Sequence, residues 1–194
     1  MKVKETFVSF TGFASYGKFA FFVELSKVGI PIEAKELAKQ AIHFPRVVIS
    51  GEPYNDREEL AKFVRWTTKD NPNIVIEIYS DGMIRPIKIG SFTNIQHNVV
   101  LQLKHTGVEY DKRINESSIN WYNEIGANFI FKIKDGDDLD EVRLLVNQYS
   151  IPKARIILTP YDNDMDFVIT FARKHGFNFI LPLREQFWND LGRK

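Results

Sequence analysis

The residues best suited to chemistry lie in five short polar segments, each directly after a predicted strand. The segments are Gly51-Glu52-Pro53, Ser80-Asp81-Gly82, Lys104-His105-Thr106-Gly107, Lys134-Asp135-Gly136 and Thr159-Pro160-Tyr161-Asp162. In α/β proteins, ligands bind beyond the carboxyl ends of parallel strands, where such loops meet. We therefore expect a ligand site there, with these candidate residues: Ser50, Gly51, Glu52, Pro53, Ser80, Asp81, Gly82, Lys104, Thr159 and Asp162.

Acid–base catalysis is the chemistry that these side chains could support. His105 is the candidate general base, and Glu52, Asp81 and Asp162 could converge with it on one ligand. The chain has no phosphate-binding glycine motif and no Ser, His and Asp in the order of a known hydrolase. Its four histidines lack the i, i+4 spacing of a metal-binding helix, so no metal site is predicted.

The absence of cysteine limits the chemistry most sharply. With no thiol in 194 residues, the chain forms no disulfide, no thiolate zinc site and no cysteine-ligated iron–sulfur cluster. Two acidic segments, 135–140 and 162–166, resemble calcium loops only in composition. Leu139 and Phe167 stand where the calcium-loop pattern requires an oxygen ligand and a glycine. Helix capping is the better interpretation of both segments.

Composition indicates one ordinary α/β domain covering residues 1–194. Forty-four per cent of the residues are hydrophobic and the formal net charge is +1, so nothing marks a nucleic-acid binder. No apolar run is long enough to cross a bilayer, and no secretion signal follows the first residues. These features predict a cytoplasmic protein. The 16 Phe, 7 Tyr and 3 Trp leave core packing and protein contact, for example through Trp188, as alternatives.

Short β-rich runs alternate with helical segments along most of the chain. Strands are predicted at residues 6–10, 19–25, 46–50, 73–79, 98–103, 128–133, 154–158 and 178–181. Helical periodicity marks residues 32–42, 60–64, 139–146 and 167–172, with Asn55 or Asp56 as an N-cap. This alternation predicts mainly parallel strands in an open sheet or a partly closed barrel. The link between Ser80 and His97 is too irregular to predict a helix.

Several segments resemble radical S-adenosylmethionine enzymes. Residues 47–53, Val-Val-Ile-Ser-Gly-Glu-Pro, resemble the strand and GGEP turn that binds the amino end of S-adenosylmethionine in that superfamily, with Ser50 replacing the first glycine. Residues 78–82 resemble the following strand and its T-N-G loop. The family most similar to this chain is 7-carboxy-7-deazaguanine synthase, which makes the deazaguanine precursor of queuosine. Its "FVRL", "FKFVV", "LMP" and C-terminal "RLH…WG" segments resemble residues 22–25, 129–133, 157–160 and 184–189.

The chain departs from this family where the radical chemistry begins. A C-x-x-x-C-x-x-C type loop follows the "FVRL" strand in the family and binds a [4Fe–4S] cluster, but here residues 25–30 run directly toward the next helix. The family's "QGEG" glutamate is also replaced in Thr11-Gly12-Phe13-Ala14. The resemblance thus implies a partial (βα)6 barrel of radical-SAM type without a cluster. Retained binding of S-adenosylmethionine is compatible with it.

These observations predict a cluster-less pseudoenzyme that acts by binding rather than by radical chemistry. Its partner would be a protein, a second copy of the chain, or a small purine-like or S-adenosylmethionine-like ligand. Two alternatives remain open: a non-redox enzyme that uses the acid–base residues, and a structural subunit of a larger assembly. For the turn at Gly51 a simpler role also remains open, in which Glu52 only caps the next helix.

Overall fold

Helices and strands alternate along the chain, as the sequence pattern predicts. A computed structural model describes residues 1–11, 18–87, 94–161 and 166–180. Its residues form two units: unit 1 holds those of Met1–Ser80 and Ile87–Gln96, and unit 2 holds those of Asp81–Pro86 and His97–Pro182. The interpretation of the chain as one domain stays a prediction.

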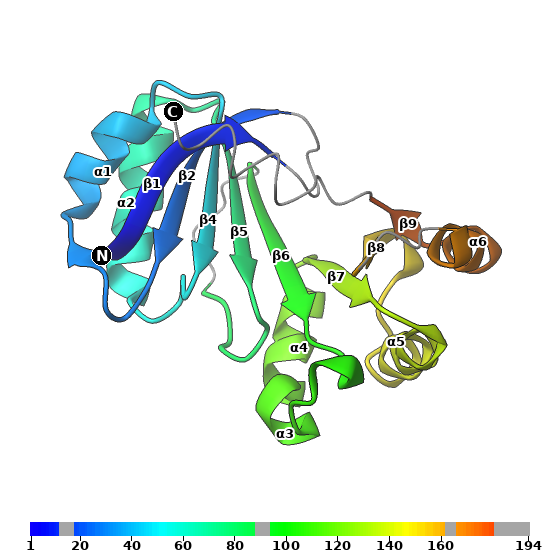
Figure 1. The fold of residues 1–194 in the computed structure, drawn as a ribbon. Helices are drawn as coiled ribbons and strands as arrows, with labels where there is room; N and C mark the ends of the chain where they lie inside the picture. The colour runs from blue at the N-terminus through cyan, green and yellow to red at the C-terminus, as the bar shows by residue number, and fades with distance from the viewer. Residues whose placement is uncertain (12–17, 88–93, 162–165, 181–194) are drawn as a thin grey trace. The chain divides into compact units, whose positions relative to one another are not determined.

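Unit 1 is a sheet with two helices packed together (Figure 1). Its strands run in the order β3-β1-β2-β4-β5; β1 is antiparallel to β2 and β3, whereas β2, β4 and β5 are parallel. The elements are β1 (Lys2–Phe10), β2 (Phe19–Leu25), β3 (Ile30–Pro31), α1 (Ala34–Ala41), β4 (Arg46–Gly51), α2 (Arg57–Asp70) and β5 (Val75–Ser80).

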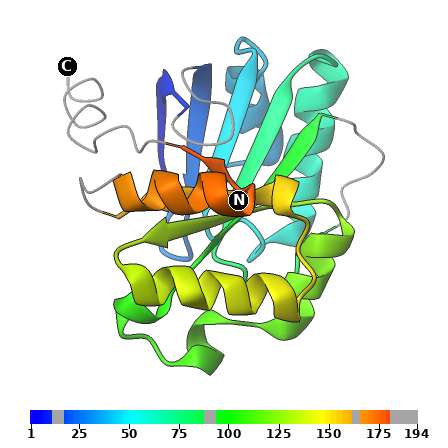
Figure 2. The same cartoon turned by 90° about the vertical axis from the view of Figure 1, so that its right-hand side faces the viewer.

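Unit 2 is a parallel sheet in the order β6-β7-β8-β9. Helices α5 and α6 run alongside each other in Figure 2. The elements are β6 (Ile95–Leu101), the 3-10 turn η1 (Lys104–Thr106), α3 (Tyr110–Arg113), α4 (Glu116–Glu124), β7 (Asn128–Ile133), α5 (Gly136–Gln148), the 3-10 turn η2 (Lys153–Arg155), β8 (Ile156–Pro160), α6 (Asp166–His175) and β9 (Asn178–Phe179).

The helices form where apolar periodicity and capping residues coincide. In α1 the apolar stripe is fully buried, with Leu37 and Ala41 both at zero exposure. Helix α2 begins after Asp56, whose Oδ1 accepts a hydrogen bond from the Glu59 amide at 3.2 Å. Helix α5 begins in the same way after Asp135. The N-cap predicted at Asn55 or Asp56 is therefore Asp56.

The mainly parallel α/β fold is confirmed, with differences at the ends of elements. The parallel set begins at β2, which pairs with β4. Residues 81–87, the described start of the irregular link, contain no helix. Ser50 lies inside β4, as predicted, whereas Gly51 and Thr159 lie inside strands rather than in loops, because parallel pairing continues to the last residues of β4 and β8. No helix in the described ranges is long and apolar enough to cross a membrane.

Candidate functional site

The turn at Gly51 is fixed against the end of β2. Gly51 is paired with Leu25 in the parallel β2–β4 ladder and has a φ of 79°, a backbone conformation that favours glycine. A Cβ atom there would lie 2.2 Å from the Leu25 carbonyl oxygen. That oxygen accepts a hydrogen bond from the Glu52 amide at 3.0 Å. Close approach of two backbones therefore requires glycine here.

The Glu52 carboxylate closes the connection between β2 and β3. Its Oε2 accepts a hydrogen bond from the Lys27 amide at 2.8 Å, and its Oε1 lies 3.2 Å from the Lys27 ammonium. The Lys27 backbone N–H, followed by its ammonium, lowers the pKa of Glu52. The sequence left helix capping open as a role for Glu52, but Asp56 caps α2.

A pocket of about 310 Å³ adjoins this turn within unit 1. The start of the chain segment that lacks the cysteine loop contributes to it, together with the first residues of the chain and the residues that lead into α2. The lining residues are Met1, Lys2, Leu25, Ser26, Lys27, Glu52, Pro53, Asn55 and Asp56. The pocket therefore combines carboxylates, ammonium groups and apolar surface at the carboxyl ends of β2 and β4.

The segment after β5 forms a local turn. Asp81 Oδ1 accepts a hydrogen bond from the Met83 amide at 2.9 Å. Gly82 has a φ of 79°, and a Cβ there would lie 2.9 Å from side-chain atoms of Val99 and Leu101. Both residues thus have structural roles within unit 2. Ser80 is the buried last residue of β5, in unit 1.

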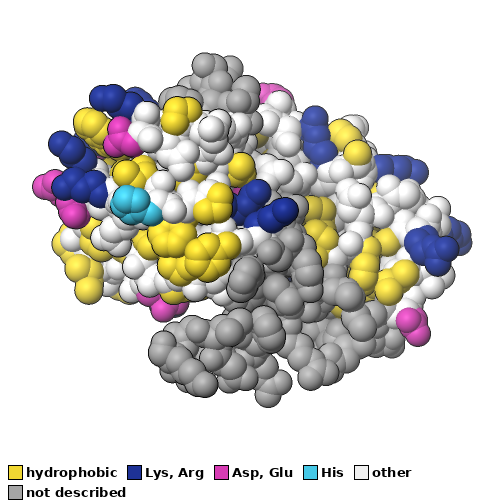
Figure 3. Space-filling view, turned by 90° about the horizontal axis from the view of Figure 1, so that it is seen from above, with side chains coloured by type: hydrophobic (Ala, Val, Ile, Leu, Met, Phe, Trp, Pro, Cys, Tyr) yellow, Lys and Arg dark blue, Asp and Glu magenta, His cyan; other side chains and the backbone are white. Residues whose placement is uncertain are grey.

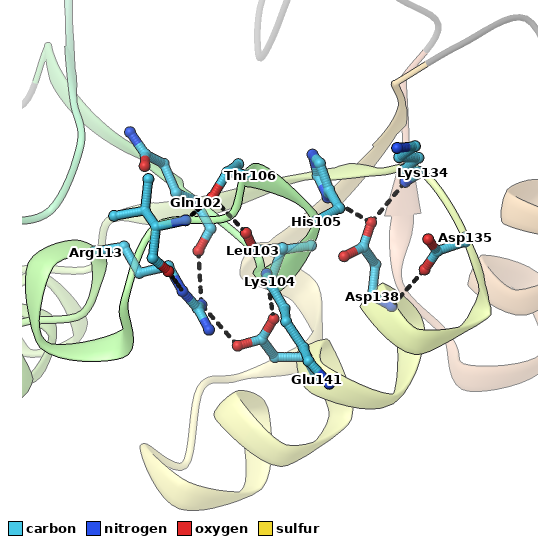
Figure 4. A network of polar contacts seen from close by, with 11 residues as sticks. Gln102, Leu103, Lys104, His105, Thr106, Arg113, Lys134, Asp135, Asp138 and Glu141 are labelled. Atoms are coloured by element: carbon cyan, nitrogen blue, oxygen red, sulfur yellow. Dashed lines mark hydrogen bonds and ion pairs between the residues drawn. The ribbon is translucent and has the colours of Figure 1, made fainter.

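His105 makes the shortest polar contact among the predicted site residues of unit 2 (Figure 4). Its Nδ1 lies 2.6 Å from Oδ2 of Asp138, which also accepts a hydrogen bond from the Lys134 amide at 2.8 Å. The side chains of His105 and Asp138 are 8% and 1% exposed. The His105 ring also packs edge-on against Tyr161, with ring centroids 4.9 Å apart.

A second set of contacts holds the η1 turn that carries His105. The Lys104 amide donates to Glu141 Oε2 at 2.7 Å, and Glu141 Oε1 lies 2.7 Å from Arg113 (Figure 4). Arg113 in turn donates to the carbonyl oxygens of Gln102 and Val108. The buried Arg113 guanidinium thus ties both sides of η1 to α5. Contacts with Arg113, Glu141 and Asp138 together fix the position of His105.

The predicted site residues do not form one cluster within a unit. Ser50, Gly51, Glu52, Pro53 and Ser80 belong to unit 1, whereas Asp81, Gly82, Lys104, His105 and Thr159 belong to unit 2. The Thr159 hydroxyl is buried without a hydrogen-bond partner. Asp162 lies outside the described residues, as does Trp188.

Sequence reasoning missed the partners of the two most informative side chains. The sequence pattern indicates Asp138 only as an acidic residue near a helix N-terminus, and nothing in it singles out Lys27. The Glu52–Lys27 and His105–Asp138 pairs are 25 and 33 residues apart along the chain. The one available signal was the double Asp137-Asp138, since a cap at Asp135 leaves a second carboxylate for another role.

A [4Fe–4S] cluster does not fit the donor set of this chain. There is no cysteine, and the described residues contain no group of three or more His, Asp or Glu side chains placed to hold a metal. The β2–β3 connection is a tight turn in which the Gly29 amide donates to the Ser26 carbonyl. A Cβ at Gly29 would lie 2.5 Å from the backbone of Val3, so β1 packs directly against this turn.

Comparison with solved structures identifies the same fold in radical S-adenosylmethionine proteins. QueE from Escherichia coli, a 7-carboxy-7-deazaguanine synthase, superimposes with a TM-score of 0.70 at 14% identity, covering 93% of this chain and 92% of QueE. Streptococcus suis SuiB bound to S-adenosylmethionine gives 0.55 at 14% identity, covering 81% of this chain and 45% of SuiB. SuiB bound to its precursor peptide SuiA gives 0.55 at 12% identity, over 80% and 43%.

These likenesses establish the fold and nothing finer. No protein-family model matches the chain, and no curated protein sequence does so. The predicted radical-SAM type of α/β fold is confirmed by the structural neighbours, and the chain carries this fold without a single cysteine.

Proposed function

We propose that this chain is a cluster-less, non-radical relative of the 7-carboxy-7-deazaguanine synthases that acts by binding. The observation that carries the proposal is the position of Glu52. Its carboxylate holds the shortened β2–β3 connection, where the family carries its cluster loop, and it lines a pocket next to the turn that resembles the S-adenosylmethionine-binding turn. A turn that resembles the S-adenosylmethionine-binding turn is thus present, whereas a [4Fe–4S] cluster would have no cysteine ligands in this chain.

The pocket beside Gly51–Pro53 favours a small ligand that carries an ammonium group. The Lys27–Glu52 ion pair is exposed, with side chains 70% and 39% accessible, and exposed pairs contribute little to stability. A ligand ammonium can therefore replace the Lys27 ammonium on Glu52 while the Lys27 amide keeps its own hydrogen bond. Apolar surface from Leu25 and Pro53 is available to the rest of the ligand. S-adenosylmethionine and S-adenosylhomocysteine have this combination of groups.

Thermal unfolding of the purified chain with each compound tests the proposal. A ligand that binds only the native state at a hundred times its Kd stabilises by about 2.7 kcal/mol, which is several degrees for a chain of this size. We expect a shift with S-adenosylmethionine and S-adenosylhomocysteine, and none with 5′-methylthioadenosine, which lacks the amino-acid end. Glu52→Gln should abolish the shift, whereas Glu58→Gln, exposed and outside the pocket lining, should keep it.

The other outcomes separate the alternatives. Equal shifts for all three compounds would place recognition away from Glu52. A deazaguanine or GTP that alone produces a shift would favour a purine-like ligand. No shift with any compound would overturn the small-ligand proposal and favour a protein partner or a structural subunit, to be sought by affinity capture. Cluster reconstitution followed by cleavage of S-adenosylmethionine would overturn the non-radical assignment.

On the face drawn in Figure 3, the lysine and arginine side chains of the described residues do not form one continuous basic patch. Lysine and arginine side chains are scattered there among acidic and apolar ones. A nucleic-acid partner usually requires a continuous basic surface, because phosphate contacts supply much of the affinity. This face therefore adds no support for nucleic acid over the small-ligand proposal.

A further inference from the structure

The carboxyl ends of three parallel strands in unit 2 meet around the His105 imidazole. His105 lies in η1 after β6, Lys134 follows β7 and leads to Asp138 in α5, and Tyr161 follows β8. Residues far apart in the sequence are thereby brought to one edge of the sheet (Figure 4). In parallel α/β sheets, this edge is where ligands bind.

Asp138 fixes both the position and the tautomer of the imidazole. The 2.6 Å contact joins Asp138 Oδ2 to His105 Nδ1, and both side chains are more than nine-tenths buried. When the ring is neutral, Nδ1–H donates to the carboxylate, so the proton-accepting lone pair lies on Nε2. The Lys134 amide restrains the carboxylate, and the ring of Tyr161 packs against the imidazole.

The second ring nitrogen of His105 keeps its hydrogen-bonding capacity unused within the described residues. No described residue forms a hydrogen bond with Nε2, and this atom is not among the buried unpartnered atoms. Figure 4 shows the ring extending away from α5, with its second nitrogen remote from Asp138. The side chain of Lys134, which is exposed, also extends away from α5 in this view.

Helix capping accounts for only part of the role of Asp138, through the hydrogen bond that its Oδ2 accepts from the Lys134 amide. Asp135 already caps α5, because its Oδ1 accepts a hydrogen bond from the Asp138 amide at 3.2 Å. Asp138 Oδ1 is buried and has no hydrogen-bond partner among the described residues. Keeping a carboxylate oxygen in this state costs free energy, since burial removes its water. A buried carboxylate that orients an imidazole, whose second nitrogen has no partner among the described residues, is the arrangement that general-base catalysis uses.

We propose that His105 is a general base, positioned by Asp138, that activates water at this edge of unit 2. Nε2 accepts a proton from a water molecule while the water oxygen forms a bond to an activated ester carbonyl carbon. The tetrahedral adduct then expels the alcohol or phenol oxygen and leaves a carboxylic acid, and the imidazolium returns its proton to solvent or to the leaving oxygen. Water and the ester are the only reactants.

This activity goes beyond the proposed binding function and uses different residues. The Glu52 pocket lies in unit 1, whereas every residue of the His105 site lies in unit 2. Failure of one proposal therefore leaves the other intact, and their experiments do not share a variant or a compound.

Hydrolysis of p-nitrophenyl acetate by the full chain tests the base, with release of p-nitrophenol as the readout. We expect a rate above buffer that falls in D₂O, as proton transfer requires. His105→Ala should lower the rate about a hundredfold. Asp138→Asn, which leaves the shape of the side chain, should lower it roughly tenfold or more. His43→Ala, an exposed histidine of unit 1, is the matched control and should match the wild type.

Nitrogen-15 NMR of the histidine side chains tests the positioning role without activity. Neutral His105 should carry its proton on Nδ1 in the wild type, and Asp138→Asn should shift the population toward Nε2–H. Circular dichroism of each variant separates this effect from loss of fold. A wild-type rate no higher than that of His105→Ala would overturn the proposal. So would a folded Asp138→Asn variant with wild-type rate and tautomer.

Discussion

The Glu52 turn of unit 1 and the His105 site of unit 2 both pair a carboxylate with a basic group, but the two pairs differ in burial. In each, a carboxylate beyond a parallel strand holds a basic group from a distant segment. The Glu52–Lys27 pair is exposed, with side chains 39% and 70% accessible, whereas the Asp138–His105 pair is 1% and 8% accessible. Under the proposed function, exposure allows a ligand ammonium to replace the Lys27 ammonium on Glu52. Burial keeps the geometry of the Asp138–His105 pair fixed.

The difference shows that burial decides what a carboxylate can do. In water, an ion pair gains little and is easily replaced. In the interior, a carboxylate that loses its partner has no solvent to replace it, so its geometry is maintained. Substitutions in both units therefore test whether burial sets the difference between the two pairs.

The largest effect is expected from Gly51→Ala. The new Cβ would lie 2.2 Å from the Leu25 carbonyl oxygen in a backbone with a φ of 79°. Strain and overpacking together should lower the free energy of unfolding by about 3 kcal/mol, measured by urea denaturation. Gly107→Ala is the matched control: its φ is 72°, nothing lies within 4 Å, and it should cost about 1 kcal/mol. Equal losses would show that the close approach to β2 is unimportant.

Asp138→Ala should have the next largest effect. It leaves the His105 ring and the Lys134 amide without an acceptor in a buried site, which costs about 2 to 3 kcal/mol. Asp140→Ala, on the exposed side of the same helix, should change the urea midpoint very little. If both variants unfold at the same urea concentration, the buried pair does not stabilise unit 2.

His97 should make the stability of the chain depend on pH. Burial lowers the pKa of His97 to about 4 from the ordinary 6.5. The unfolded chain therefore binds a proton before the native chain does as the pH falls. Stability should be complete above pH 6.5 and fall by on the order of 2 kcal/mol as the pH approaches 4.

Urea denaturation of His97→Gln across this pH range checks the expectation. The slope of stability against pH should become shallower than in the wild type. Gln96→Ala, at an exposed neighbouring position of β6, should keep the wild-type slope even if it weakens the strand. An unchanged slope in His97→Gln would assign the acid sensitivity to other groups.

Lys27→Ala should have the smallest effect on stability, because the ion pair that it removes is exposed. The pKa of Glu52 should rise only in part, since the backbone N–H of residue 27 still donates to the carboxylate. NMR titration of the Glu52 carboxyl measures this change. A return to the ordinary pKa of a glutamate would mean that the ammonium, and not the amide, controls the turn.

Much of the fold could be predicted from local patterns. The apolar stripe of α1, the cap at Asp56 and the glycine stop after α6 are signals within a few residues of one another. The ends of the strands were less predictable, since pairing with a neighbour carries Gly51 and Thr159 into the sheet. Of the candidate site, the sequence indicated Glu52 and His105 but neither of their partners.

Periodicity and residue type are local properties, so the α/β alternation and the loss of cysteine-based chemistry can be read from the amino-acid sequence alone. The contacts of Glu52 with Lys27 and of His105 with Asp138 join residues 25 and 33 positions apart, so they depend on how the chain folds in three dimensions. Strand order brings such segments together, and packing sets their burial. Burial in turn determines whether a charged pair stays exchangeable in solvent or is held fixed in the interior.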